Sequence, residues 1–229
     1  MKRTLRQIIE SRLQKSRTTT DSSPRCCFGD DLLSLMIAAS ETNQLKVDLK
    51  LNMNEIIEEC KTFFFAGHET TSSLLSWAMF LMSKHQEWQA KLREEVLKEC
   101  GKGTPNANML AKLKLVNMAL LEVLRLYGPV VALKQRIYWG KDASEFNPLR
   151  FKNGISKAAK HPNALLAFLI GPRACSGQSF ATSEAKTVLA LILQRFSFSF
   201  SPDYKHAPAN HITLQPRHGL LIVIKPLNM

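Results

Sequence analysis

A long proline-free stretch at residues 52–84 constrains the fold of this chain more than any other feature. As a single helix its roughly 33 residues would be about 50 Å long. Asn52 and Glu55 have the spacing of a capping box at its start. The middle, residues 63–82, is apolar all round, so the sequence predicts a helix buried on every side in a larger core. Glu69 within that window favours a buried helix over a membrane span.

The rest of the chain predicts a mainly α fold with a small β-sheet near the C-terminus. Helical periodicity is present at residues 4–15, from Asp30 or Asp31 to about 40, and at 87–99, 115–127 and 178–196. Alternating apolar and polar residues predict short strands at 196–200, 211–215 and 219–225. Residues 137–163 are expected to be loop, and the Ser/Thr-rich residues 16–29 a mobile linker.

Composition places the chain among globular proteins, with 229 residues, 45% hydrophobic residues and a net charge of +12. The basic residues are spread out without a recognition motif, so no nucleic-acid partner is expected. The charge suits an acidic redox partner or an anionic membrane surface, and an ordinary solvated surface explains it equally well. The N-terminal residues resemble neither a signal peptide nor a membrane anchor. Five cysteines without paired spacing argue against a disulfide framework and a zinc site: Cys26, Cys27, Cys60, Cys100 and Cys175.

Residues 168–177 form the segment that carries the most chemistry. They hold two glycines, an arginine and Cys175, directly before a predicted helix. The N–H groups and positive dipole end of a helix N-terminus favour the thiolate form of a cysteine placed there. One thiolate is too few for structural zinc but suffices as the protein ligand of a haem iron. The ordinary alternative, a buried structural cysteine beside a Gly-Pro turn, is outweighed by six fitting features within ten residues.

Each neighbour of Cys175 has a physical role in that interpretation. Gly171 permits a turn that a side chain would obstruct, and Gly177 lets the following helix approach a flat porphyrin. The Arg173 guanidinium is suited to a haem propionate. Phe168 could shield the sulfur from water.

These residues fit the pattern F-x-x-G-x-R-x-C-x-G, which resembles the haem-binding signature of cytochrome P450, the haem-thiolate monooxygenases. Three further stretches resemble family motifs in the family's order. Residues 66–71 (AGHETT) resemble the oxygen-activating motif of the long central helix, and residues 122–125 the E-x-x-R helix. Residues 146–151 resemble the segment whose arginine joins that pair. The flanking sequences are most similar to plant enzymes of the clan that contains secologanin synthase and the cytokinin hydroxylases.

The resemblance implies that residues 1–229 are one partial domain, the C-terminal part of the cytochrome P450 fold. It implies insertion of one oxygen atom from O2 into a small apolar substrate, in plant secondary metabolism. The implied cofactor is haem b, with NADPH electrons arriving through a separate NADPH-cytochrome P450 reductase. The full-length family lies at the cytosolic face of the endoplasmic reticulum membrane, which it meets through an N-terminal part absent here.

The resemblance also assigns roles to individual residues. Glu69 and Thr70 would supply protons during oxygen activation, while Ala66 and Gly67 would adjoin the cofactor. The alternative for the first two is a threonine bonded to its own helix and a glutamate paired elsewhere. A structural network is implied for three further residues, namely Glu122, Arg125 and Arg150.

The chain departs from the family pattern at several points. Leu149 stands where the family usually has glutamate, and some tens of residues are missing near 136/137. The family's N-terminal half is absent as well. These departures leave open a second hypothesis, a truncated and catalytically incompetent member with weak or no haem binding. A basic helical binding module is a third and weaker alternative.

Overall fold

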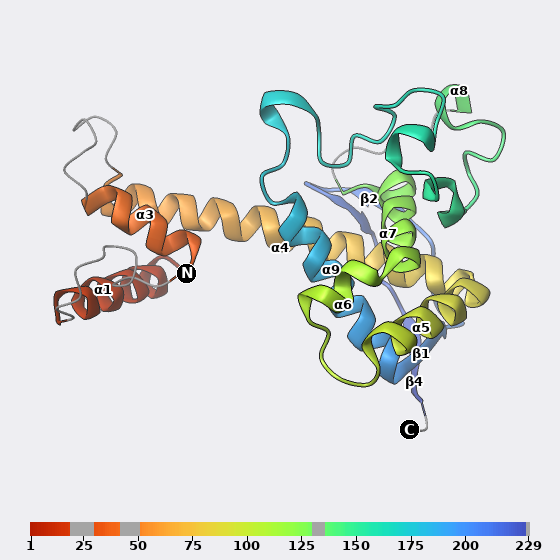
Figure 1. Ribbon diagram of the computed structural model, residues 1–229, viewed down its shortest axis with the longest axis horizontal. Helices are drawn as coiled ribbons and strands as arrows, with labels where there is room; N and C mark the ends of the chain where they lie inside the picture. Colours follow the sequence, from red (N-terminus) through yellow and green to blue (C-terminus); the bar gives the residue numbers. More distant parts are fainter. Residues whose placement is uncertain (19–29, 42–50, 130–135, 228–229) are drawn as a thin grey trace. The chain divides into compact units, whose positions relative to one another are not determined.

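The computed structural model describes residues 1–18, 30–41, 51–129 and 136–227 (Figure 1). The chain divides into two compact units, residues 1–66 and residues 67–229. The first unit contains α1 (Lys2–Thr18), α3 (Leu32–Glu41) and the first part of α4 (Met53–Lys84). Apolar side chains from all three helices form its small core: Ile9, Ile37, Ile56 and Ile57.

Helix α4 begins where the sequence predicts, because the capping box is present. The Asn52 side-chain oxygen accepts hydrogen bonds from the N–H groups of Asn54 and Glu55, at 2.9 and 3.1 Å. In return the Glu55 carboxylate accepts from the Asn52 N–H at 2.6 Å. These bonds satisfy N–H groups that a helix start leaves without intrahelical partners.

The prediction that α4 is buried on every side is wrong for its middle. Residues 62–68 are all exposed, and the exposed fractions of Phe63, Phe64 and Phe65 are 46%, 61% and 46%. The described residues therefore provide too little cover for this apolar stretch. Farther along, Trp77, Ala78 and Met82 are fully buried, as predicted.

The second unit is built around the second part of α4 and four helices that follow it in the chain. They are α5 (Gln86–Cys100), α6 (Ala107–Lys112), α7 (Lys114–Tyr127) and α9 (Gln178–Arg195). Helix α5 packs against both α7 and α9. The core between them has fully buried side chains from every long helix: Trp77, Leu92, Val116, Val123, Leu189 and Leu193. The predicted helices are confirmed to within two or three residues at each end, whereas α6 was not predicted.

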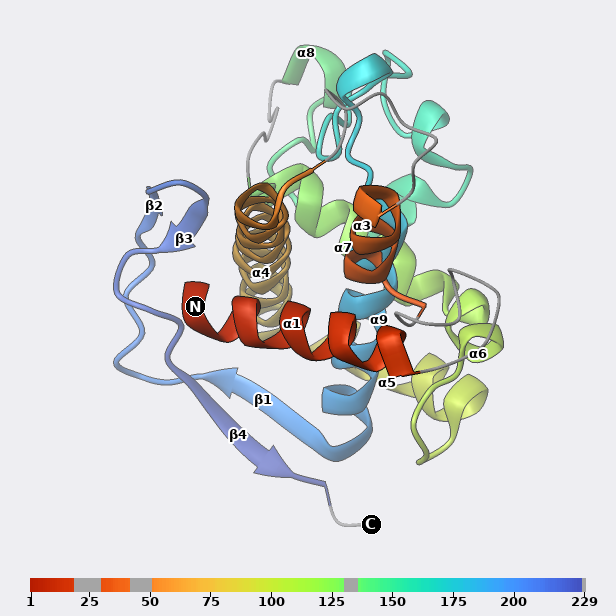
Figure 2. The same cartoon turned by 90° about the vertical axis from the view of Figure 1, so that its left-hand side faces the viewer.

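Two small antiparallel sheets complete the second unit (Figure 2). Strand β1 (Phe196–Phe200) pairs with β4 (Ile222–Pro226), and β2 (Pro208–Asn210) pairs with β3 (Leu214–Pro216). The prediction of 196–200 is confirmed. The predicted strand 211–215 is wrong in its first part, because residues 211–213 make the hairpin turn that joins β2 to β3.

Residues 137–163 hold more regular structure than the predicted loop. They include the end of α8 (Arg136–Trp139) and two 3-10 helices, η2 (Pro148–Phe151) and η3 (Ile155–Lys157). A second small core forms here around apolar side chains with no helical periodicity: Trp139, Ala143, Phe151, Ala158 and Ala164.

The expected linker at 16–29 is wrong at its first three residues, which belong to α1 because serine, arginine and threonine do not break a helix. Its remainder, with Cys26 and Cys27, lies outside the described residues, as do residues 130–135 beside the expected gap at 136/137. Among the helices that the structure describes, none is both long enough and apolar enough to cross a membrane.

Candidate active site

Cys175 lies in a tight loop between the 3-10 helix η4 (Gly171–Arg173) and α9, whose first residue is Gln178. The Cys175 N–H donates to the Phe168 carbonyl at 2.8 Å, and the Ala174 N–H donates to the Gly171 carbonyl at 3.0 Å. These bonds close the loop on itself. The thiol is unpaired and exposed at the start of α9, so the loop presents it outward.

Two glycines shape this loop in different ways. Gly171 has a φ of +80°, a backbone conformation that side chains disfavour. Gly177 caps α9 with an ordinary φ of −86°, but a Cβ there would lie 3.8 Å from the Cys175 sulfur. Gly177 therefore keeps the space beside the sulfur open. Arg173 is exposed, and the half-buried Phe168 ring packs against the main core.

The surroundings of Cys175 form an exposed apolar surface. All residues from Leu169 to Ser176 are exposed. Leu169, Ile170 and Phe180 keep 48%, 51% and 75% of their surface. Exposed apolar side chains gathered in this way mark a binding surface, and this one adjoins a thiol whose thiolate form can bind a metal. The donor set and the open space fit a flat apolar group such as a porphyrin.

Glu69 and Thr70 lie half-buried on the part of α4 that belongs to the second unit. Glu69 Oε2 accepts a hydrogen bond from Gln215 Nε2 on β3 at 3.1 Å. Glu69 Oε1 lies 3.6 Å from His68 Nδ1. Glu69 is thus paired with a residue from a distant segment, a partner that periodicity in the sequence could not reveal.

Ala66 and Gly67 are both exposed, on either side of the division between the two units. Apart from its own helix turn, a Cβ at Gly67 would meet no atom of the described residues within 4 Å. No side chain of the described residues therefore packs onto the helix directly at Gly67.

The E-x-x-R pair forms a buried ion pair within α7. Arg125 Nε and Nη2 each donate to the Glu122 carboxylate at 2.7 Å, and neither side chain is exposed. Arg125 also donates to the carbonyls of Ala143 and Glu145 at 2.6 and 2.9 Å. Glu122 Oε1 accepts a further bond from the Asn147 N–H at 2.9 Å. The pair thereby ties α7 to the loop after α8.

Arg150 joins this network from η2. Its Nε lies 3.6 Å from Glu122 Oε1, and its Nη2 lies 2.7 Å from Asp142 Oδ2. The hydrogen bond from Arg150 lowers the pKa of Asp142 from its ordinary value. Helical spacing predicted the contact of Glu122 with Arg125, and the family resemblance implied that Arg150 joins them. Asp142 was missed because it lies in a segment without periodicity. Leu149 stands where the family usually has glutamate. Its side chain is half exposed, and the contacts of Arg150 are present with leucine at this position.

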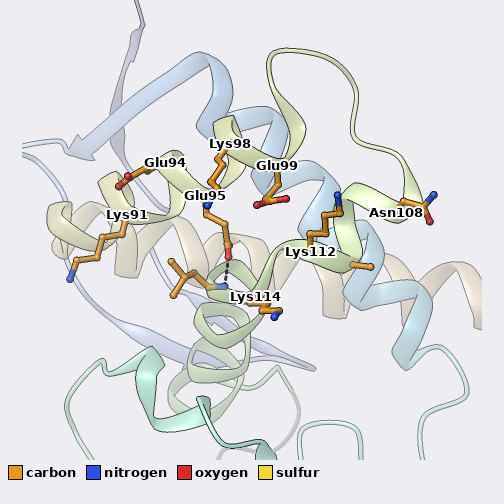
Figure 3. A pocket seen from close by; sticks show the side chains of 10 residues that line it. Lys91, Glu94, Glu95, Lys98, Glu99, Asn108, Lys112 and Lys114 are labelled. Atoms are coloured by element: carbon orange, nitrogen blue, oxygen red, sulfur yellow. Dashed lines mark hydrogen bonds between the residues drawn. The ribbon is translucent and has the colours of Figure 1, made fainter.

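A groove among the described residues lies elsewhere, between α5, α6 and the start of α7 (Figure 3). Lysines and glutamates line it, among them Lys91, Lys98 and Glu99. Glu95 is used structurally there, since its carboxylate accepts from the N–H groups of Leu115 and Val116 at 2.8 and 2.9 Å. That contact caps the start of α7 and has no relation to Cys175.

The profile of the Cytochrome P450 family matches residues 1–138 and residues 132–223. The chain belongs to the cytochrome P450 family. Cytochrome P450 709B1 of Arabidopsis thaliana is 47% identical over 258 residues, covering 99% of this chain and 48% of that protein. Cytochrome P450 CYP72A219 of Panax ginseng is 43% identical over 256 residues, covering 97% of this chain and 48% of the relative.

Secologanin synthase 1 of Catharanthus roseus is 42% identical over 231 residues, covering 86% of this chain and 44% of that protein. The expected similarity to the plant clan of cytochromes P450 that contains secologanin synthase is thus confirmed. The mainly helical structure with small antiparallel sheets also agrees with the C-terminal part of the cytochrome P450 fold. The chain spans about half the length of the curated relatives it matches.

Proposed function

We propose that this chain carries the haem-thiolate site of a monooxygenase that inserts one oxygen atom from O2 into a small apolar substrate. Cys175 would bind the haem iron through its thiolate sulfur. The observation that carries this proposal is the exposed Cys175 thiol, held by its own loop at the start of α9 beside exposed apolar side chains. Membership of the cytochrome P450 family supports the reaction class.

The residues around Cys175 have separate tasks. Haem b, when bound, supplies the oxygen chemistry, which thiolate ligation favours. Arg173 is exposed and suited to hold a propionate by charge-assisted hydrogen bonds. Gly171 makes the turn, and Gly177 leaves room beside the sulfur. Phe168 holds the Cys175 N–H through its carbonyl.

Glu69 and Thr70 hold and move protons, while Ala66 and Gly67 give the cofactor access to α4. The carboxylate of Glu69 is held by a hydrogen bond and half-buried, as a proton donor in a largely apolar helix requires. A structural role is proposed for three residues that perform no chemistry and fix the loop that follows α7, namely Glu122, Arg125 and Arg150. The buried Glu122–Arg125 pair, the carbonyls that accept from Arg125 and the Arg150–Asp142 contact support this role.

Electrons come from NADPH through a separate NADPH-cytochrome P450 reductase, and the net charge of +12 suits an acidic redox partner. By the same resemblance, the full-length protein works in plant secondary metabolism at the cytosolic face of the endoplasmic reticulum membrane. The named relatives are plant proteins, which supports the first part of this proposal.

Residues 1–229 correspond to a partial cytochrome P450 domain that lacks some tens of residues near 136/137. Two findings support this proposal. The two matches to the family profile overlap at residues 132–138. The alignment with cytochrome P450 709B1 runs over 258 residues, more than the 229 of this chain.

A form with weak or no haem binding is the alternative. The exposure of Phe63, Phe64 and Phe65 and of the whole Cys175 loop favours it. An apolar surface of this kind promotes aggregation when nothing covers it.

The test is to add haem to the purified chain, reduce it, and add carbon monoxide. Thiolate ligation predicts a strongly red-shifted Soret band that is lost in Cys175→Ala and kept in Cys100→Ala, a matched control at a buried cysteine. A spectrum typical of histidine ligation, or a red-shifted band that survives in Cys175→Ala, would reject the proposal. Failure of the wild-type chain to take up haem would favour the alternative.

A further inference from the structure

We propose that Gln215 is a positioning residue for the Glu69 carboxylate and determines which of its two oxygens exchanges protons. The inference rests on the proposed role of Glu69 in proton supply. It concerns a contact between residues 146 positions apart in the sequence, one on α4 and the other on β3.

The side-chain amide of Gln215 is fully engaged as a donor. Its Nε2 donates to Glu69 Oε2 at 3.1 Å and to Thr213 Oγ1 at 3.0 Å. An amide nitrogen carries two hydrogens, so these two acceptors fix its direction. Thr213 is itself buried, with 3% of its surface exposed, and gives the amide a rigid second support.

The strand that carries Gln215 is anchored on the same helix as Glu69. The carbonyl of Leu214 accepts from Ser73 Oγ at 2.6 Å and from Trp77 Nε1 at 2.8 Å. The Leu214 N–H donates to the Pro129 carbonyl at 2.9 Å. Glu69, Ser73 and Trp77 are successive i, i+4 neighbours and share one face of α4. The hairpin therefore holds Gln215 in place opposite Glu69.

The two oxygens of Glu69 consequently face different groups. Oε2 meets an amide, which neither takes up nor releases protons at neutral pH. Oε1 faces His68 Nδ1 at 3.6 Å, with the imidazole more than half exposed. Because Oε2 already accepts the hydrogen bond that Gln215 donates, Oε1 is the oxygen left to exchange a proton. Gln215 thus orients the acid without touching the reacting atoms.

The first arm of the test follows the Gln215 side-chain amide by nuclear magnetic resonance in the purified chain. Glu69→Gln should move the Gln215 amide resonances, since their acceptor changes from a carboxylate to a neutral amide. Asn210→Leu, at an exposed position that pairs with Leu214 in the same hairpin, should leave them in place. Resonances that do not respond to Glu69→Gln would overturn the contact.

The second arm measures how much of the NADPH consumed by the reductase-coupled holoenzyme ends as hydrogen peroxide instead of product. Gln215→Leu should raise the peroxide to product ratio about tenfold while the KM for the organic substrate stays unchanged. The reason is that a misdirected Glu69 carboxyl supplies protons less effectively. The double variant Gln215→Leu, Glu69→Gln should have the same peroxide to product ratio as Glu69→Gln alone. Asn210→Leu should match the wild type.

The outcomes separate this inference from the proposed function. Absence of the thiolate Soret band in the wild type rejects the proposed function, and with it a catalytic meaning for the contact. If the Soret band is normal but Gln215→Leu leaves the peroxide to product ratio unchanged, only the assignment of Gln215 is rejected. The same holds if the effects of Gln215→Leu and Glu69→Gln on that ratio multiply in the double variant.

Discussion

Glu122 and Arg125 are joined by two hydrogen bonds of 2.7 Å while both side chains are completely buried. Burying two charges is costly, and the pair repays that cost only because further partners satisfy both groups. Arg125 reaches the carbonyls of Ala143 and Glu145, and Glu122 accepts the Asn147 N–H. The pair therefore fixes the loop between α8 and η2 as well as α7.

Removing one partner of this pair should strongly destabilise the second unit. Arg125→Leu leaves the Glu122 carboxylate buried without its counter-charge, which is expected to lower the free energy of unfolding by about 3–5 kcal/mol. Urea denaturation followed by circular dichroism measures the loss.

The matched control for that variant is the Glu58–Lys61 pair, which has the same i, i+3 spacing and the same 2.7 Å separation but lies at the surface. Lys61→Ala should leave the urea midpoint almost unchanged, because exposed pairs contribute little. Equal losses of unfolding free energy in Arg125→Leu and Lys61→Ala would contradict the claim that burial makes the Glu122–Arg125 pair important for stability.

Asp142 should contribute to the pH dependence of stability. The hydrogen bond from Arg150 lowers the pKa of Asp142 in the folded protein below its ordinary value of 3.8. A carboxylate with a depressed folded pKa adds stability above the unfolded pKa, and that stability is lost as pH falls through the folded pKa. The stability difference between the wild type and Asp142→Asn should therefore be full near neutral pH and shrink below about pH 4. Urea titrations at several pH values measure it, and a difference that grows towards acid pH would refute the assignment.

The two glycines beside Cys175 should respond differently to alanine. Gly171→Ala places a Cβ at a φ of +80° and should cost about 1–2 kcal/mol of stability. Gly177→Ala has an ordinary φ and should change the stability of the haem-free chain by about 0.5 kcal/mol or less. Its Cβ would make an ordinary contact with the sulfur at 3.8 Å but would occupy space that a porphyrin bound to that sulfur needs, so haem binding should weaken by about 1–3 kcal/mol through overpacking. Urea denaturation and haem titration measure the two effects, and equal haem affinity in Gly177→Ala and the wild type would argue against a cofactor at this sulfur.

Haem should protect the Cys175 thiol from alkylation. Cys175 is exposed whereas Cys100 is buried, so a thiol reagent should modify Cys175 first in a background with Cys26 and Cys27 replaced by serine. Burial raises the pKa of Cys60 and of Cys100, which slows their reaction further. Peptide mass spectrometry should show rapid labelling of Cys175 without haem and little labelling with it. Undiminished labelling in the presence of bound haem would place the cofactor elsewhere.

Local signals in the sequence were enough for the long helices and for the cysteine loop, but not for the short helices α6 and α8. The Asn52 and Glu55 capping box gave the start of α4, and the glycines around Cys175 gave the turn before α9. Glu122 and Arg125 share a helix face, so their contact follows from helical spacing alone.

Contacts made across the fold were beyond the sequence. The Gln215–Glu69 hydrogen bond joins a short hairpin to the middle of α4, and no periodic pattern links those segments. Asp142 lies in a segment without periodicity, so its pairing with Arg150 could not be read from spacing. The exposure of Phe63, Phe64 and Phe65 was also missed, because an apolar helix predicts burial without saying which surface provides it.

The most direct test of a Cys175 haem site is iron X-ray absorption on the haem-loaded chain, which reports the atoms bound to the iron. The wild type should show one sulfur neighbour besides the porphyrin nitrogens, and Cys175→Ser should show none. An iron coordinated only by nitrogen or oxygen in the wild type, or a sulfur neighbour that persists in Cys175→Ser, would contradict the account.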